Sequence, residues 1–209
     1  MSVLVPFAAA LLSLRLAGLL LRRGQRVWAG AFVAYAVGSG ATAWGSAHGF
    51  DAASFRVYYG AGALLTAPLL GAGALELLGR PVGRALGLAW AGLALGTVIA
   101  MPIHGAFTTA VPSASAHLGW APRVLAIAGN SAGTLLIVAV AIATIRRRTV
   151  GNTLILAGVA CAAIGSGLSG FGVAATSSLV AVAVVLLYLG AAPEALVAVT
   201  RRAVRARAR

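Results

Sequence analysis

A few polar side chains interrupt the long apolar stretches of this sequence. Six of them can contribute hydrogen bonds to a small bound molecule: Ser39, Thr66, Asn130, Ser131, Thr134 and Ser166. Asn130 is the best candidate, because one helix cannot satisfy both ends of its amide. A serine or threonine hydroxyl can instead bond back to its own helix. We therefore expect these residues to line a cavity, with ordinary helix packing as the alternative for each hydroxyl.

Two of these six residues, both serines, lie in matching tripeptides. Ser39 is the centre of a Gly-Ser-Gly run, and Ser166 is the centre of a second one. Glycine near the middle of a membrane can mark a broken helix that lines a site. Close helix packing is the other interpretation, because small residues let two backbones approach each other.

Three charged side chains, Arg15, Glu76 and Glu194, lie within or near the ends of apolar stretches. An unpaired arginine at the centre of a membrane helix costs about 2.5–3.5 kcal/mol. We therefore expect Arg15 to form an ion pair with Glu76 or Glu194, which lie at a similar depth. The alternatives are that Arg15 reaches the headgroups, that Glu76 pairs with Arg80, and that Glu194 pairs with the basic tail.

His48, His104 and Asp51 are the candidates for a metal site. Imidazole and carboxylate groups bind zinc or copper, and histidine also senses pH. Their spacing matches no metal motif, so we expect no metal and no other cofactor. The sequence has no lysine, which excludes a retinal Schiff base, and it has no phosphate loop or nucleophile elbow. An enzyme is therefore not expected, and an intramembrane enzyme is the third alternative.

The composition predicts that lipid surrounds the protein. Hydrophobic residues make up 61% of the 209 residues and charged residues 9%, whereas about a quarter of a soluble domain is charged. The net charge of +13 comes from arginine alone. The arginines cluster at the ends of apolar stretches, which is typical of membrane topology signals and not of nucleic-acid binding. The lipid bilayer is therefore the expected partner, and no nucleic acid is expected.

The hydropathy pattern predicts an all-α, single membrane domain over residues 1–209 with seven transmembrane helices. A first three-helix unit covers 3–79, a connector helix covers 82–103, a second three-helix unit covers 123–199, and a basic cytoplasmic tail covers 200–209. The seven helices are expected at 3–21, 28–47, 57–79, 82–103, 123–145, 152–172 and 177–199, with one long loop at 104–122.

The arginines also predict the orientation. Thirteen of them lie in the connections on one side and in the tail, whereas Arg56 and Arg123 lie on the other side. The positive-inside rule then places the N-terminus outside and the C-terminus inside. Trp28 is expected at the inner interface, and Trp44 and Trp120 at the outer one. A bias toward Ala, Gly, Val, Leu and Arg suggests a GC-rich bacterium, so a multi-pass protein of the bacterial inner membrane is expected.

The two three-helix units resemble each other weakly. Arginine runs end the first and fifth helices, the Gly-Ser-Gly runs lie in the second and sixth, and Leu70-Gly71 and Leu189-Gly190 lie in the third and seventh. One connector between two three-helix units keeps both units in the same orientation. This arrangement predicts a parallel repeat of the kind that several transporters use.

In topology the chain resembles the three-plus-one-plus-three carriers, namely the SWEET and PQ-loop sugar carriers and the PnuC vitamin carriers. It has no proline-glutamine motif, so no family residues can be assigned. The run RVYYGAGALLTAPLLGAG resembles the third helix of seven-helix membrane proteins from GC-rich bacteria. The resemblance in topology implies a small-molecule carrier, whereas the resemblance of this one helix implies no function. The alternatives are a seven-helix sensor or a structural subunit, as a homo-oligomer or in a larger membrane complex.

Overall fold

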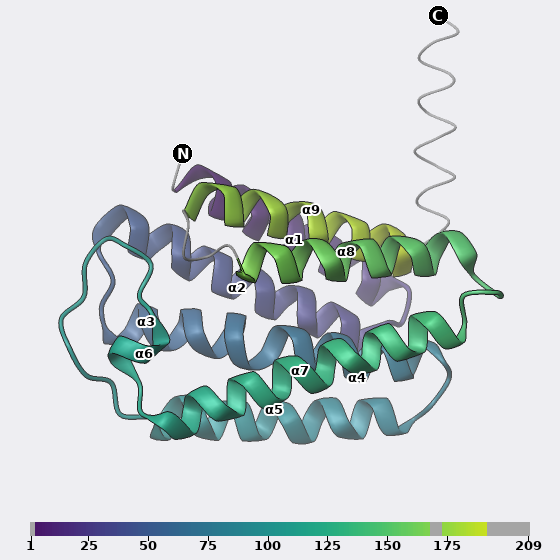
Figure 1. Ribbon diagram of the computed structural model, residues 1–209, viewed down its shortest axis with the longest axis horizontal. Helices are drawn as coiled ribbons and strands as arrows, with labels where there is room; N and C mark the ends of the chain where they lie inside the picture. Colours follow the sequence, from purple (N-terminus) through teal and green to yellow (C-terminus); the bar gives the residue numbers. More distant parts are fainter. Residues whose placement is uncertain (1–2, 168–172, 192–209) are drawn as a thin grey trace, which may run out of the picture.

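The computed structural model describes residues 3–167 and 173–191, and within these ranges the fold is all-α, as predicted (Figure 1). The only β pairing there is an isolated bridge between Ile103 and Leu118. The elements in chain order are α1 (Leu4–Arg22), α2 (Arg26–His48), α3 (Ala52–Tyr58), the π-helix η1 (Tyr59–Leu65), α4 (Thr66–Leu77), α5 (Val82–Ala100), α6 (Ala114–His117), α7 (Trp120–Ala143), α8 (Thr149–Gly167) and α9 (Val173–Ala191).

Elements α3, η1 and α4 form one continuous helix from Ala52 to Leu77, which we call the third helix. It begins five residues before the predicted start because Asp51 caps it. The Asp51 carboxylate accepts a hydrogen bond from the Ser54 N–H at 2.7 Å, and the Ser54 hydroxyl accepts one from the Asp51 N–H at 2.9 Å. Such a capping box satisfies N–H groups at the start of a helix. The predicted polar link therefore already contains the first turns of the third helix.

Within the described ranges, four helices are long and apolar enough to cross a membrane. They are Leu4–Arg22, Ala52–Leu77, Val82–Ala100 and Trp120–Ala143. Their outward faces carry large apolar side chains; Leu88, Leu135 and Ile99, for example, are about 70% exposed. Exposed apolar surface of this extent is characteristic of a helical membrane protein, because exposing so many apolar side chains to water is energetically unfavourable.

The contacts between the long helices follow a closed order. Helix α1 packs on α2, α2 on the third helix, and the third helix on α7. The order continues from α7 to α8, from α8 to α9, and from α9 back to α1. Helix α5 lies outside this ring, where it packs mainly against the third helix. The ring therefore encloses a space that α5 does not reach.

Glycine residues let the third helix approach its neighbours closely. A Cβ on Gly71 would lie 2.7 Å from the Gly133 Cα, and one on Gly38 would lie 3.0 Å from the Gly62 backbone nitrogen. The Gly-Ser-Gly run of α2 is therefore at a packing contact. Gly190, the expected counterpart of Gly71, packs against Gly151 of the neighbouring α8. The two glycines do not occupy equivalent helix contacts.

The tryptophan assignment was partly wrong. Trp44 and Trp120 are 62% and 76% exposed, but Trp28 is fully buried and therefore does not form part of an exposed aromatic belt. Gly73 makes room for it, because a Cβ there would collide with the indole ring of Trp28. Trp28 therefore belongs to the apolar core near the first turn of α2.

We expect Gly133→Ala to destabilise the protein by about 1–3 kcal/mol, the usual cost of overpacking a tight site. The added methyl group would press on the main chain at Ala67 and Pro68, which a side-chain rotation cannot relieve. Gly96→Ala is the matched control, since nothing lies within 4 Å of a Cβ there. Thermal unfolding in detergent measures the difference, and equal stability of the two variants would contradict this account.

Candidate functional site

A cavity of about 820 Å³ lies inside the ring of helices. Its walls come from α2, the third helix, α7, α8 and α9. The lining residues are Ala31, Phe32, Tyr35, Tyr58, Gly62, Ala63, Thr66, Ala67, Leu70, Asn130, Ser131, Gly133, Thr134, Leu135, Ile137, Val159, Ala162, Ala163, Ala183, Val184 and Leu187. The volume lies within the range of about 300–1,000 Å³ that small-molecule sites occupy.

Four of the six polar residues singled out in the sequence line this cavity: Thr66, Asn130, Ser131 and Thr134. Ser39 is not among the lining residues; it is 8% exposed and interacts with the Tyr35 side chain one turn away. The side chain of Ser166 lies outside the part of the chain that the structure describes. The structure thus brings together residues of the third helix and α7 that are far apart in the sequence.

The wall formed by the third helix contains the π-helix η1 and, after it, Pro68. In an α-helix residue 68 would donate to the Leu64 carbonyl, and in a π-helix it would donate to the Ala63 carbonyl. Proline has no N–H group, so it can donate to neither. The missing N–H therefore leaves one carbonyl at this point of the helix without its main-chain donor, and that carbonyl needs a donor from elsewhere.

Side chains from two other helices donate hydrogen bonds to the carbonyl groups at this point of the third helix. The Asn130 amide of α7 donates to the Ala63 carbonyl at 2.9 Å, and the Trp90 indole of α5 donates to the Leu64 carbonyl at 2.7 Å. Thr66 also donates to the Ala61 carbonyl at 2.9 Å. An unpaired carbonyl in an apolar environment costs several kcal/mol. Pro68 therefore explains why a side-chain donor is needed at this point of the third helix, where Asn130 and Trp90 both donate.

The bond to Ala63 also fixes the orientation of the Asn130 amide. A carbonyl can only accept a hydrogen bond, so the Nδ2 group faces Ala63 and Oδ1 is the other end of the amide. No hydrogen bond to Oδ1 is formed within the described part of the chain. Since Asn130 lines the cavity, it offers a hydrogen-bond acceptor there.

The end of the cavity nearest the arginine-rich connections is apolar. Phe32, Ile137, Val184 and Leu187 line the cavity and also belong to the main hydrophobic core. That core continues to Leu20, Trp28 and Ile155. The polar groups of Tyr58, Thr66, Asn130 and Ser131 lie on the other side of these apolar residues along their helices. The cavity therefore has a polar end and an apolar floor.

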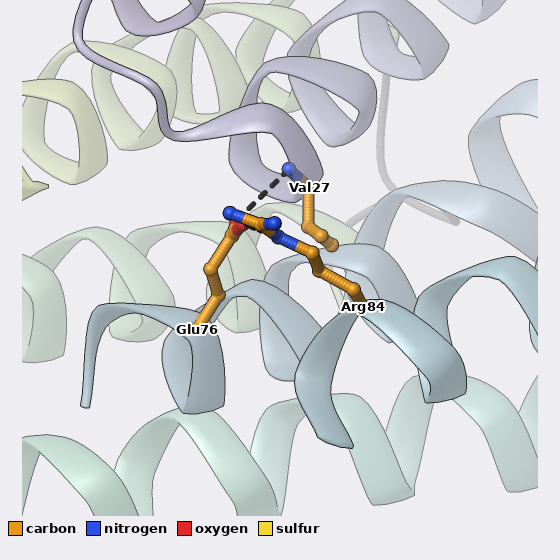
Figure 2. A network of polar contacts seen from close by, with 3 residues as sticks. All are labelled: Val27, Glu76 and Arg84. Atoms are coloured by element: carbon orange, nitrogen blue, oxygen red, sulfur yellow. Dashed lines mark hydrogen bonds and ion pairs between the residues drawn. The ribbon is translucent and has the colours of Figure 1, made fainter. Parts of the chain in front are cut away.

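The expected pair between Arg15 and Glu76 is not formed. Glu76 instead pairs with Arg84, whose Nε lies 2.6 Å from Oε1, and its Oε2 accepts a hydrogen bond from the Val27 N–H at 3.1 Å (Figure 2). The Glu76 side chain is 11% exposed and that of Arg84 is 57% exposed. Arg15 lies on an exposed position of α1, and Glu194 lies outside the described residues.

Gly79 explains why Arg84, and not Arg80, reaches Glu76. The third helix ends at Leu77, and Gly79 adopts φ +74°, which reverses the chain. The Arg80 N–H then bonds to the Leu75 carbonyl at 3.0 Å, and α5 begins at once with Pro81 as its N-cap. The first turn of α5 thereby lies over the end of the third helix. The Glu76 carboxylate ties α5 and α2 to the third helix.

The residues considered for a metal site have other contacts. His48 stacks on Trp44, with ring centroids 4.3 Å apart, and Asp51 caps the third helix. The hydrogen bond from the Ser54 hydroxyl, followed by that from the Ser54 N–H, lowers the pKa of Asp51 below its ordinary value. His104 is exposed, and its carbonyl lies 2.8 Å from Nδ1 of His117. In the described part of the chain, no three potential ligands converge.

Sequence reasoning missed Tyr35 and Tyr58, which line the cavity, and it missed the π-helix. The available signal was Gly60 and Gly62 shortly before Pro68, because glycine and proline together weaken a helix. Comparison of the chain with models of known protein families, with curated proteins and with solved structures finds no match. The site is therefore interpreted from its own geometry.

Asn130→Leu should destabilise the protein by about 1–3 kcal/mol, because it removes the hydrogen bond from the side-chain amide to the Ala63 carbonyl. Pro68→Ala restores an N–H at that point of the helix, so the cost of Asn130→Leu should be smaller in the Pro68→Ala background. Chemical unfolding of the four proteins of this double-mutant cycle measures the coupling. Ser131→Leu serves as the control on α7. Additive effects of Asn130→Leu and Pro68→Ala would contradict the role assigned to Pro68.

Arg84→Glu should lower stability by about 1–3 kcal/mol, because Glu76 then faces a like charge in place of a charged hydrogen-bond donor. Glu76→Arg with Arg84→Glu should restore part of the loss. Arg80→Glu, in the same connection, is the matched control and should change little. Thermal unfolding in detergent measures all four proteins. Rescue of Arg15→Glu by Glu76→Arg would instead support the pair expected from the sequence.

Proposed function

We propose that this protein is a small-molecule carrier of the bacterial inner membrane with seven transmembrane helices. The N-terminus is placed outside and the C-terminus inside, because thirteen of the arginines then lie on the cytoplasmic side. The four helices long and apolar enough to span a bilayer support a membrane location. In this proposal α2, α8 and α9 also cross the membrane, because they pack side by side with these four helices in the ring.

The cavity is the main support for a carrier. It lies among the middle turns of five helices, and it combines an apolar floor with hydroxyl and amide groups. Thr134, for example, lies about 14 Å from the Ala143 end of α7 and about 21 Å from its Trp120 end, at 1.5 Å per residue. Binding near the midplane suits alternating access, in which a site is exposed to one side and then to the other.

The packing order also supports this proposal. The first unit packs in the order α1, α2, third helix, and the second packs in the order α7, α8, α9. The two units meet at two contacts, that of the third helix with α7 and that of α9 with α1. If the first unit is swapped with the second, each of these contacts takes the place of the other. A two-fold axis along the membrane normal would produce this pattern. The connector α5 lies outside it, as a parallel repeat requires.

Two other functions use the same site differently. A sensor or a structural subunit would bind a ligand in the cavity without exposing it alternately to the two sides. An intramembrane enzyme would need paired catalytic groups there, but the cavity lining within the described residues carries no charged side chain. The carrier and the sensor therefore remain to be separated by experiment.

A cavity cysteine tests alternating access without knowledge of the cargo. Cys161 is the single cysteine, so Cys161→Ala gives a background for Thr134→Cys. A carrier should expose this cysteine to a membrane-impermeant thiol reagent in right-side-out and in inside-out vesicles. The readout is the labelled fraction against time for each vesicle type. Labelling from one side alone would favour the sensor over the carrier.

Three single cysteines serve as controls in the same background. Ser113→Cys lies in the connection before α7 and should react only from outside, whereas Thr149→Cys at the start of α8 should react only from inside. These two also test the orientation. Ile127→Cys on α7 is 64% exposed in the structure and is not a cavity residue, so the membrane should shield it from the reagent.

A further inference from the structure

We propose that the cavity takes an uncharged, largely apolar molecule that carries a hydroxyl or N–H group, and that this molecule enters from the hydrocarbon of the bilayer between α7 and α8. The proposal rests on the proposed function, because it takes the cavity as the binding site. It adds the chemical class of the cargo and the route by which it enters.

The route follows from residues that belong to the cavity and to the outer surface at once. Leu135 lines the cavity and is 69% exposed, and Ser131 and Ala163 also line it and are exposed. Ser131 and Leu135 lie on α7, and Ala163 lies on the facing part of α8. Helices α7 and α8 also pack less extensively than α8 and α9 or α7 and the third helix. The cavity therefore opens sideways between α7 and α8.

The depth of this opening determines what lies outside it. Leu135 is about 12 Å from the Ala143 end of α7 and about 22 Å from the Trp120 end. The hydrocarbon core of a bilayer is about 30 Å thick. If α7 spans the membrane, the opening faces acyl chains and not the headgroups. Molecules that reach it are those dissolved in the hydrocarbon.

The lining excludes charged cargo. No charged side chain of the described residues lines the cavity, and an unpaired ion in such an environment costs many kcal/mol. It also disfavours a sugar, because most lining side chains are apolar and cannot replace the hydrogen bonds that several hydroxyl groups make with water. An apolar body fits the floor formed by Phe32, Ile137 and Leu187.

The hydrogen-bond donor on the cargo follows from Asn130. The Nδ2 group is held by the Ala63 carbonyl at 2.9 Å, so Oδ1 is the free acceptor of this amide. Ser131 and Thr134 lie one and four residues later on α7 and also line the cavity. A cargo hydroxyl or N–H group would satisfy Oδ1, whereas an ether or hydrocarbon would leave it unpaired. The site therefore distinguishes an alcohol from its methyl ether.

The test uses a photoactivatable long-chain alcohol with a diazirine in its chain, its methyl ether, and the full-length protein in lipid nanodiscs. Irradiation should attach the alcohol to cavity residues identified by mass spectrometry. The ether should bind about five-fold more weakly, the equivalent of about 1 kcal/mol for one hydrogen bond. An excess of glucose should not compete. Displacement by glucose, or equal labelling by alcohol and ether, would overturn the assignment.

Substitutions at the opening test the route. Leu135→Trp and, on the facing helix, Ala163→Trp should reduce labelling of the cavity, because a bulky side chain narrows the passage. Ile127→Trp is the matched control on α7, since Ile127 is 64% exposed and lies away from the cavity lining. Gel filtration confirms that each variant is folded. Unchanged labelling in both folded opening variants would refute the lateral route.

The outcomes separate this inference from the carrier. If the alcohol labels the cavity but the thiol reagent reaches Thr134→Cys from one side only, the ligand class is supported and transport is refuted. Access to Thr134→Cys from both sides, without labelling by the alcohol, supports a carrier and refutes the ligand class. The two measurements use different probes, so one can fail without the other.

Discussion

The absence of one N–H group, at Pro68, determines how the centre of this protein is built. One main-chain carbonyl of the third helix therefore has no N–H donor within the helix, and an unpaired carbonyl is costly in apolar surroundings. Asn130 of α7 and Trp90 of α5 both donate at this point of the third helix. A local defect of one helix thus fixes the position of two others. It also places the Asn130 amide, with one end occupied and one end free, at the wall of the cavity.

Small residues complete this arrangement. Gly71 and Gly133 let the third helix and α7 meet almost backbone to backbone, and Gly38 and Gly62 do the same for α2 and the third helix. Close packing on these two sides draws α2, the third helix and α7 together. Helix α8 packs closely with α9 instead, through Gly158 and Gly190. The space between the two groups of helices is the cavity. The contact between α7 and α8 is, with that between α9 and α1, one of the two least extensive contacts in the ring.

The sequence predicted the features that depend on local pattern. Hydropathy located the helices, and the rarity of polar groups in apolar stretches pointed to Thr66, Asn130, Ser131 and Thr134, which line one cavity. It could not predict features that depend on how the chain turns. Arg84 was overlooked because it is eight residues from Glu76, and only the reversal at Gly79 brings them together. The capping box of Asp51 and Ser54, in contrast, depends only on residues three positions apart and is therefore a local signal of the helix start.

The charged side chains of the described residues lie outside the cavity, and this determines which molecules the cavity can bind. Glu76 and Arg84 meet at the ends of their helices, where Arg84 remains 57% exposed and the nearly buried Glu76 carboxylate is compensated by Arg84 and by the Val27 N–H. There the pair joins α2, the third helix and α5. The cavity, in contrast, relies on shape and on a few neutral hydrogen-bonding groups. A site of this kind discriminates by leaving its own polar atoms unpaired when the wrong molecule binds. In an apolar environment this penalty lets an acceptor such as Oδ1 of Asn130 select among molecules that the floor of the cavity would otherwise accept equally.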